Sequence, residues 1–212
     1  MTTFITCFVG DSITLGTGDD DYLGWPARIS TDARSCGHSL TIYNLGVRAE
    51  TTAQIRQRWR RETALRLPDH LPGHLVFNFG TNDTRMVNDK VEVPLHQSAS
   101  NARAMIEEAL AWGKPTLWIG QIPVDETNQP LDSIMGITFW FSNKRIRQTN
   151  EVFKDIADDL GVPFLDLFSV LHGDSVWERE HKQGDSVHPT TEGYAIIAEL
   201  IGQWDAWRAW LA

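Results

Sequence analysis

The stretch Phe4-Ile5-Thr6-Cys7-Phe8-Val9-Gly10-Asp11-Ser12 decides the fold, because an apolar run stops abruptly there at a small polar turn. The run is short, rich in β-branched and aromatic residues and bounded by Gly10, which predicts a buried strand at residues 4–9. A buried parallel strand delivers its last residues to the rim of a sheet, where ligands bind in open α/β proteins. We therefore expect Ser12 at the mouth of a crevice, although Asp11 and Ser12 are also ordinary N-cap residues.

The rest of the chain alternates short apolar runs with longer amphipathic segments. Further strands are expected at residues 40–43, 75–79, 116–119 and 163–167. Helices are expected at residues 22–33, 51–67, 95–112, 142–160 and 191–210. This alternation indicates βαβ units with right-handed crossovers and a parallel sheet covered on both faces. No repeat, linker or shift in composition marks a boundary, so residues 1–212 are expected to form one domain.

Two segments, 121–141 and 168–184, do not fit the alternation. Both follow a predicted strand, which places them at the ligand-binding end of the sheet. The first contains the apolar residues Ile122, Pro123, Ile134, Met135, Ile137, Phe139, Trp140 and Phe141, among others. They would either wall a pocket or form a lid, or pack a small core of their own as Ω-loops do.

Composition excludes several classes of function. The net charge of −9 argues against nucleic acid as a partner, since binding it requires a basic face. One basic run, Arg56, Arg58, Arg60 and Arg61, is interpreted as a solvated helix face. No apolar stretch is long enough to span a bilayer. Because the chain begins directly with the first predicted strand, we expect no signal peptide in it. We expect a cytoplasmic enzyme, with an already processed chain as the alternative.

The two cysteines and the C-terminal tryptophans are expected to be structural. Cys7 and Cys36 are too few for a metal cluster and are predicted to be reduced thiols. Three tryptophans, Trp204, Trp207 and Trp210, form a helical stripe. Core packing is the favoured interpretation of this stripe, and a homo-oligomer contact is the alternative.

The turn 184–189 supplies the parts that a serine nucleophile needs. Asp185 precedes His188 by three residues, close enough to hold one imidazole nitrogen while the other faces outward. Acyl transfer by Ser12 would need such a base, an orienting carboxylate and donors for the oxyanion. Taken alone, this pair is more typical of a capping Asp beside a surface His.

Candidate oxyanion donors stand at the ends of three strands. Gly46 would leave its backbone N–H unshielded, Asn82 would extend a carboxamide, and the N–H of Ser12 would be the third. Gly46 and Asn82 are also ordinary turn residues. Asp11 is interpreted as a structural turn residue whose side chain need not face the site.

Four separated blocks together resemble the SGNH hydrolases, the family of GDSL esterases and lipases. Gly10-Asp11-Ser12-Ile13 is similar to the first block, with Ile where the short name has Leu, and Asn44-Leu45-Gly46 to the second. The third and fourth blocks are matched by Gly80-Thr81-Asn82-Asp83 and Asp185-Ser186-Val187-His188-Pro189. The sequence around these blocks, including Gly24-Trp25-Pro26 and Gly46-Val47-Arg48, also resembles small bacterial members described as lysophospholipase-like.

The resemblance implies a three-layer α/β/α sandwich with a flavodoxin-like, five-stranded parallel sheet. It implies a Ser12, Asp185 and His188 triad, an oxyanion hole of Ser12, Gly46 and Asn82, and no metal or organic cofactor. The expected activity is hydrolysis of a small-molecule or acyl ester through an acyl-serine. A carbohydrate O-acetyl esterase is the second hypothesis, and a non-catalytic protein that binds a small ligand is the third.

Overall fold

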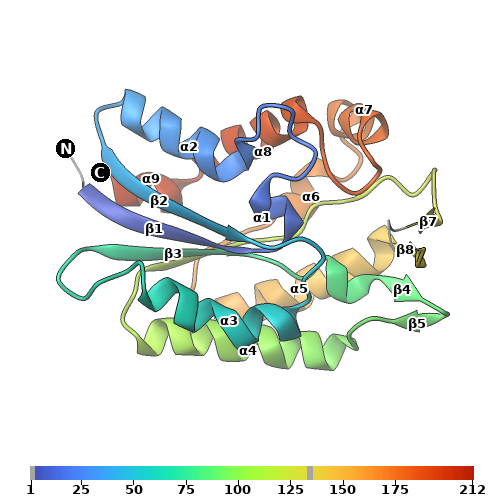
Figure 1. Ribbon diagram of the computed structural model, residues 1–212, viewed down its shortest axis with the longest axis horizontal. Helices are drawn as coiled ribbons and strands as arrows, with labels where there is room; N and C mark the ends of the chain where they lie inside the picture. The colour runs from blue at the N-terminus through green and yellow to red at the C-terminus, as the bar shows by residue number, and fades with distance from the viewer. Residues whose placement is uncertain (1–2, 133–135) are drawn as a thin grey trace.

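A central parallel sheet organises the computed structural model, which describes residues 3–132 and 136–212. Its strands lie in the order β2-β1-β3-β6-β9 (Figure 1). The strands are β1 (Thr3–Gly10), β2 (Ser39–Gly46), β3 (Gly73–Asn78), β6 (Thr116–Ile119) and β9 (Phe164–Leu165). Each neighbouring pair is parallel, and Gly10 aligns with Gly46 on one side and with Asn78 on the other. The predicted five-stranded parallel sheet is therefore confirmed, in the flavodoxin-like order.

Strand β1 shows why the sheet is buried on both faces. Phe4 and Phe8 point into one apolar cluster, whereas Cys7 and Val9 point into the other. Successive side chains of a strand lie on opposite faces, so a strand with two apolar faces needs a helical layer on each. This arrangement gives the predicted three-layer α/β/α sandwich.

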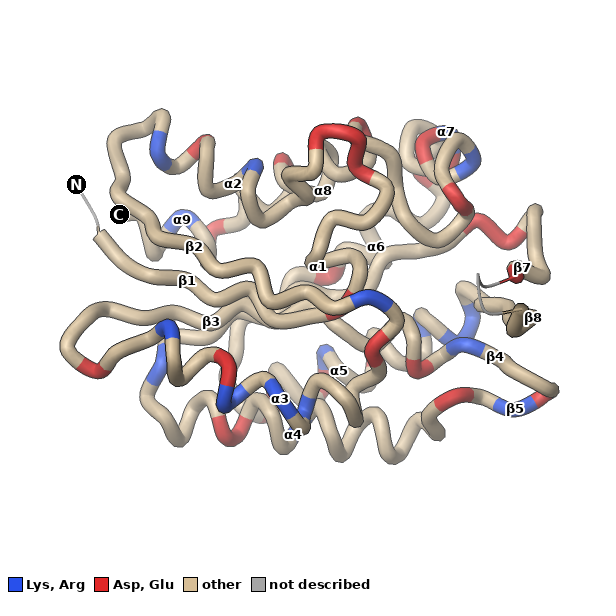
Figure 2. The backbone as a smooth tube through the Cα atoms, in the orientation of Figure 1, with Lys and Arg blue, Asp and Glu red and all other residues tan. Residues whose placement is uncertain are grey.

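The helices form the two outer layers (Figure 1). One layer contains α1 (Ser12–Leu15), α2 (Gly24–Ser35), α6 (Leu167–Leu171), α8 (Thr191–Gln203) and α9 (Asp205–Leu211). The other contains α3 (Thr52–Ala64), α4 (Leu95–Ala111) and α5 (Asn143–Leu160). Charged residues lie on these outer helices and on loops, while β1, β2 and β3 carry none in their central parts (Figure 2). Within the described residues, no helix has the length and apolarity needed to cross a membrane.

The last predicted helix, residues 191–210, is wrong as a single element. The chain is helical to Gln203, extended at Trp204 with φ −71° and ψ 126°, and helical again from Asp205. The break lays α9 against the core, where Trp207 is 2% exposed and Trp210 stacks on His74 with ring centroids 4.4 Å apart. The tryptophan stripe is thus a packing feature, as the favoured interpretation predicted.

Short elements fill the two irregular segments. The first contains β7 (Leu131–Asp132) and β8 (Thr138–Trp140), which pair with each other. β8 also pairs with β4 (Met86–Val87), which forms a hairpin with β5 (Lys90–Val91). This four-stranded antiparallel sheet was not predicted, because two- and three-residue strands carry no readable periodicity. The second segment contains α6 and α7 (Ser175–Gln183).

The apolar residues of segment 121–141 mostly pack inward. Ile122 joins the main core, and Val124 and Phe141 form a cluster with Ile146, Phe168 and Val187. Of the apolar residues in this segment, Ile134 and Met135 lie outside the described residues. The described part therefore packs a core of its own, which was one of the two expectations.

Candidate active site

Ser12 lies where the first strand meets the first helix. β1 ends at Gly10, Asp11 caps α1 by accepting the N–H of Ile13 at 3.0 Å, and Ser12 is the first helical residue. The predicted N-cap role is thus confirmed for Asp11, and Ser12 stands at the carboxyl end of the sheet. Ser12 is only 5% exposed, so its hydroxyl lies in a sheltered site.

The turn between α7 and α8 holds Asp185 and His188. Asp185 accepts the backbone N–H groups of Val187 and His188 at 3.0 and 2.7 Å, and Ser186 adopts a left-handed φ of 72° that closes this turn. Burial alone would raise the pKa of Asp185, but the hydrogen bonds from His188 and from the backbone outweigh it and lower the pKa to about 2. Asp185 is therefore ionised at neutral pH.

A continuous hydrogen-bonded chain joins these two regions. His188 Nδ1 lies 2.7 Å from Asp185 Oδ2, and His188 Nε2 lies 2.8 Å from Ser12 Oγ. Because an ionised carboxylate only accepts hydrogen bonds, Nδ1 carries the imidazole proton and Nε2 faces the serine as an acceptor. The structure thus brings together three residues that are up to 176 positions apart in the sequence.

Asn82 reaches the same site from the end of β3. It begins the short 3₁₀ helix η1 (Asn82–Thr84) and is 7% exposed. Its Nδ2 donates to Glu50 O at 3.0 Å and to Asp11 Oδ2 at 3.3 Å. Asp11 is the structural turn residue that the sequence predicted, and its second carboxyl oxygen also contacts Asn82.

Gly46 lies beside Ser12, but its N–H is not free as predicted. The N–H donates to Asn44 Oδ1 at 3.0 Å, and Asn44 Nδ2 donates to Thr14 O at 2.8 Å. A Cβ at Gly46 would lie 2.3 Å from the backbone nitrogen of Leu15, so glycine is required for the close approach of β2 to α1. The spacing of the motif does not reveal that the side chain of Asn44 accepts the Gly46 N–H.

Two residues that hold α1 in place, Asn78 and Thr14, were not singled out from the sequence. Asn78 Nδ2 donates to Ile119 O and Gly120 O at 3.2 and 3.0 Å, and the Thr14 hydroxyl donates to Asn78 O at 3.2 Å. These bonds tie α1 to the ends of β3 and β6.

Arg58 was predicted on a solvated face, yet it donates to Gly10 O at 3.0 Å and pairs with Glu50 at 2.6 Å. That prediction was wrong for Arg58.

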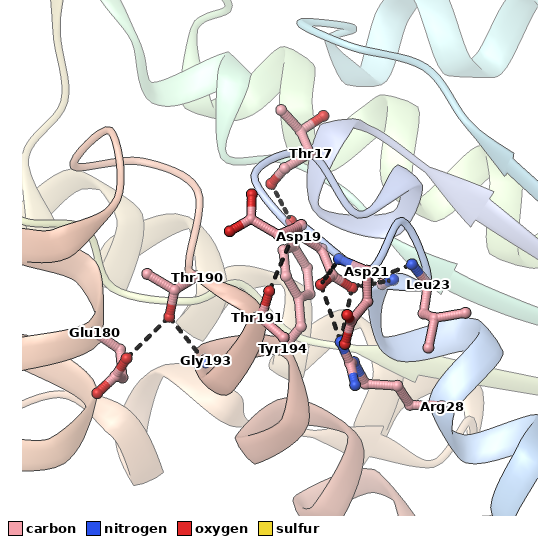
Figure 3. Close-up of polar contacts among 12 residues, drawn as sticks. Thr17, Asp19, Asp21, Leu23, Arg28, Glu180, Thr190, Thr191, Gly193 and Tyr194 are labelled. Carbon is pink, nitrogen blue, oxygen red and sulfur yellow. Dashed lines mark hydrogen bonds and ion pairs between the residues drawn. The ribbon is translucent and has the colours of Figure 1, made fainter.

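The loop after α1 is locked to the helix that follows His188 (Figure 3). Asp19 accepts the Gly24 N–H at 2.7 Å and pairs with Arg28 at 2.9 Å. Although burial opposes it, these hydrogen bonds hold the pKa of Asp19 below its usual value. Tyr194 of α8 donates its hydroxyl to Thr17 O at 2.8 Å, so the helix that follows the His188 turn also holds the loop that follows Ser12.

A separate cavity of about 260 Å³ lies next to the turn that carries His188. Among the described residues, its lining includes Asp125, Trp177 and His181 but none of Ser12, Asp185 and His188. The N–H of Asp125 donates to Ser186 O at 2.9 Å, which ties the cavity wall to the turn. His181 is 1% exposed and, within the part of the chain that is described, neither ring nitrogen has a hydrogen-bond partner.

In residues 3–132 and 136–212, no group of three or more His, Cys, Asp or Glu side chains is arranged to hold a metal ion. Cys7 and Cys36 are both free thiols, as predicted.

Comparison with known proteins places this site in a family. Residues 8–196 match the model of the GDSL-like lipase/acylhydrolase family. A search of curated proteins found no match. The chain thus belongs to the GDSL-like lipase/acylhydrolase family, which the match over most of its length shows.

Solved structures have the same fold. A lipase/acylhydrolase from Enterococcus faecalis has a TM-score of 0.77 at 22% identity, with 97% of this chain and 96% of that chain covered. Axe2, an acetylxylan esterase from Geobacillus stearothermophilus, has a TM-score of 0.69 at 18% identity, with 96% and 95% covered. The esterase EstA from Pseudoalteromonas sp. has a TM-score of 0.67 at 16% identity, with 98% of each chain covered.

Proposed function

We propose that this protein is a carboxylic ester hydrolase in which Ser12 is the nucleophile. The observation that carries the proposal is the hydrogen-bonded chain from Ser12 Oγ through His188 to Asp185, with 2.8 and 2.7 Å between successive heavy atoms. These distances suit direct proton transfer from the hydroxyl to Nε2. Membership of the GDSL-like lipase/acylhydrolase family supports the same reaction class.

The reaction proceeds in two steps. As Ser12 Oγ attacks the ester carbonyl, His188 Nε2 takes its proton and Asp185 stabilises the imidazolium that forms. His188 then returns the proton to the alcohol, which leaves as the C–O bond of the tetrahedral intermediate breaks. In the second step His188 activates water, which hydrolyses the acyl-serine and releases the acid. The mechanism uses no metal or organic cofactor.

The oxyanion is held by donors from three strand ends. The backbone N–H of Ser12 supplies one of them. The carboxamide of Asn82 supplies the second by exchanging its bond with Glu50 O for the oxyanion, since both of its N–H groups are bonded in the structure. The third comes from the turn that begins at Gly46, whose N–H must exchange its bond with Asn44 Oδ1 for the oxyanion.

The substrate is proposed to be a small or acyl ester. A carbohydrate acetyl ester is the second candidate, favoured by the likeness of the fold to Axe2, which is an acetylxylan esterase. The resemblance to lysophospholipase-like proteins keeps longer acyl chains within the first candidate. Both candidates use the same triad and differ only in the walls of the site.

Hydrolysis of a p-nitrophenyl ester series of increasing chain length tests this proposal. Wild-type protein should turn over at least one ester, and Ser12→Ala should lose that turnover. The chain-length optimum then measures the acyl site, and release of acetate from an acetylated xylooligosaccharide tests the second candidate. Equal rates in both proteins would refute Ser12 as nucleophile, and no turnover of any substrate would favour a binding protein.

A further inference from the structure

The carboxyl group of Asp11 connects the nucleophile turn to Asn82. Asp11 is 2% exposed, and its two oxygens have different partners. Oδ1 accepts the N–H of Ile13 at 3.0 Å, which caps α1, and Oδ2 accepts Nδ2 of Asn82 at 3.3 Å. The residue next to the nucleophile thus contacts a proposed oxyanion donor that lies 71 positions away in the sequence.

We propose that Asp11 is a positioning residue, which fixes the Asn82 carboxamide in the orientation that serves the oxyanion. This inference rests on the proposed function. Capping a helix of four residues requires only one carboxylate oxygen, so the cap does not account for Oδ2. The contact with Asn82 does account for it, because a carboxylate in a buried site needs partners for both oxygens.

Asn82 has few other restraints on its amide. Its second contact is with Glu50 O, at 3.0 Å, and that residue is tied back to the nucleophile strand through Arg58. Asp11 and Glu50 thus take both N–H groups of the carboxamide and set its plane. In the reaction the oxyanion replaces Glu50 O on one N–H while Asp11 holds the other, so loss of the Asp11 contact leaves the amide free to rotate. A rotation of this kind moves a donor away from the developing charge.

The adjacent acid, Asp83, does not share this task. It accepts from the backbone N–H of Thr52 at 2.8 Å and from the Thr52 hydroxyl at 2.5 Å, which ties η1 to the start of α3. Asp11 and Asp83 are thus two buried acids with different partners. Only the carboxyl group of Asp11 has an oxygen on the Asn82 amide itself.

A double-mutant cycle between Asp11 and Asn82 tests the inference. Asp11→Asn keeps the size of the side chain but has one acceptor oxygen, so when that oxygen caps Ile13 its amide group faces Asn82 donor to donor. Assayed on the best p-nitrophenyl ester, Asp11→Asn should lower kcat about 10- to 100-fold while KM stays within about twofold. In an Asn82→Ala background the same substitution should change kcat by less than about twofold.

Two further variants keep the test interpretable. Asp174→Asn alters another aspartate N-cap, which accepts from Val176 and Trp177 and contacts no residue of the proposed site. It should lower the thermal midpoint and leave kcat unchanged. Asp11→Ser retains a short capping oxygen that does not reach Asn82, and it serves in the cycle if Asp11→Asn does not fold.

The possible outcomes separate this inference from the proposed function. An unchanged kcat in Asp11→Asn, or an equal loss in both Asn82 backgrounds, would overturn the positioning role alone. Absence of Ser12-dependent turnover in the wild-type protein would overturn the proposed function and the inference with it.

Discussion

Replacing His181 by Phe should make the protein less sensitive to acid. Burial lowers the pKa of His181 from 6.5 to about 4, against the opposing influence of the Ser186 carbonyl and of Asp185 and Asp125. The folded protein therefore keeps His181 neutral down to about pH 4, while the unfolded chain protonates near pH 6.5. Protonation of His181 therefore costs no unfolding free energy above pH 6.5. The unfolding free energy falls as the pH is lowered from 6.5 to 4, where the unfolded chain binds a proton that the folded protein does not.

The size of the effect follows from that difference. One pKa unit corresponds to about 1.4 kcal/mol. As the pH falls from 6.5 to 4, the protonation of His181 in the unfolded chain should therefore lower the free energy of unfolding by about 3 kcal/mol. His181→Phe removes the titration and retains an aromatic ring against Trp177, whose ring centroid lies 4.6 Å away. At pH 7 the variant should be as stable as the wild type or more so, because two buried nitrogens without partners are removed.

Urea unfolding followed by tryptophan fluorescence at several pH values from 7 to 4 measures the effect. His74 also has a pKa lowered to about 4, but it is present in both proteins and cancels in their difference. The unfolding free energy of the wild type should fall more steeply than that of His181→Phe, by about 3 kcal/mol at pH 4. Parallel curves over this range would refute the reasoning that His181 is held neutral by burial.

Three other predictions follow from single contacts. Trp207→Ala should lower the unfolding free energy by about 3–5 kcal/mol in urea titrations, since it empties a fully buried site in the core; a loss below about 1 kcal/mol would contradict that packing. Gly18→Ala should lower kcat, because φ at Gly18 is 90° and a Cβ there would lie 3.2 Å from the Cβ of His188; unchanged kinetics would show that this approach is unimportant. Asp185→Asn should lower kcat by about 10⁴-fold, because the imidazole loses its orienting charge; a kcat within tenfold of wild type would argue against the triad.

The sheet could be predicted because its signals are local. Each parallel strand is a short apolar run that ends in glycine or a polar turn, as at Gly10 and Gly120, and burial on both faces makes the run continuous. The helices between them have apolar residues at helical spacing. The break at Trp204 was missed, because the tryptophan stripe continues through it and no Gly or Pro stands at that position.

The site could be predicted only in part. The motifs identified Ser12, Asp185 and His188, and the structure places all three within hydrogen-bonding reach of one another. The contacts of Asp11 with Asn82 and of Arg58 with Gly10 span 71 and 48 positions, and no periodicity reports such a pairing. The spacing around Gly46 likewise could not reveal that Asn44 accepts its N–H.

Covalent labelling with a fluorophosphonate tests the central claim most directly, because it needs no knowledge of the natural ester. The wild-type protein should gain the mass of one phosphonyl group, and peptide mapping should place that group on Ser12. Ser12→Ala should remain unlabelled, and His188→Ala should label far more slowly because the serine has lost its base. Labelling of Ser12→Ala at the wild-type rate, or modification at another residue, would contradict Ser12 as the nucleophile.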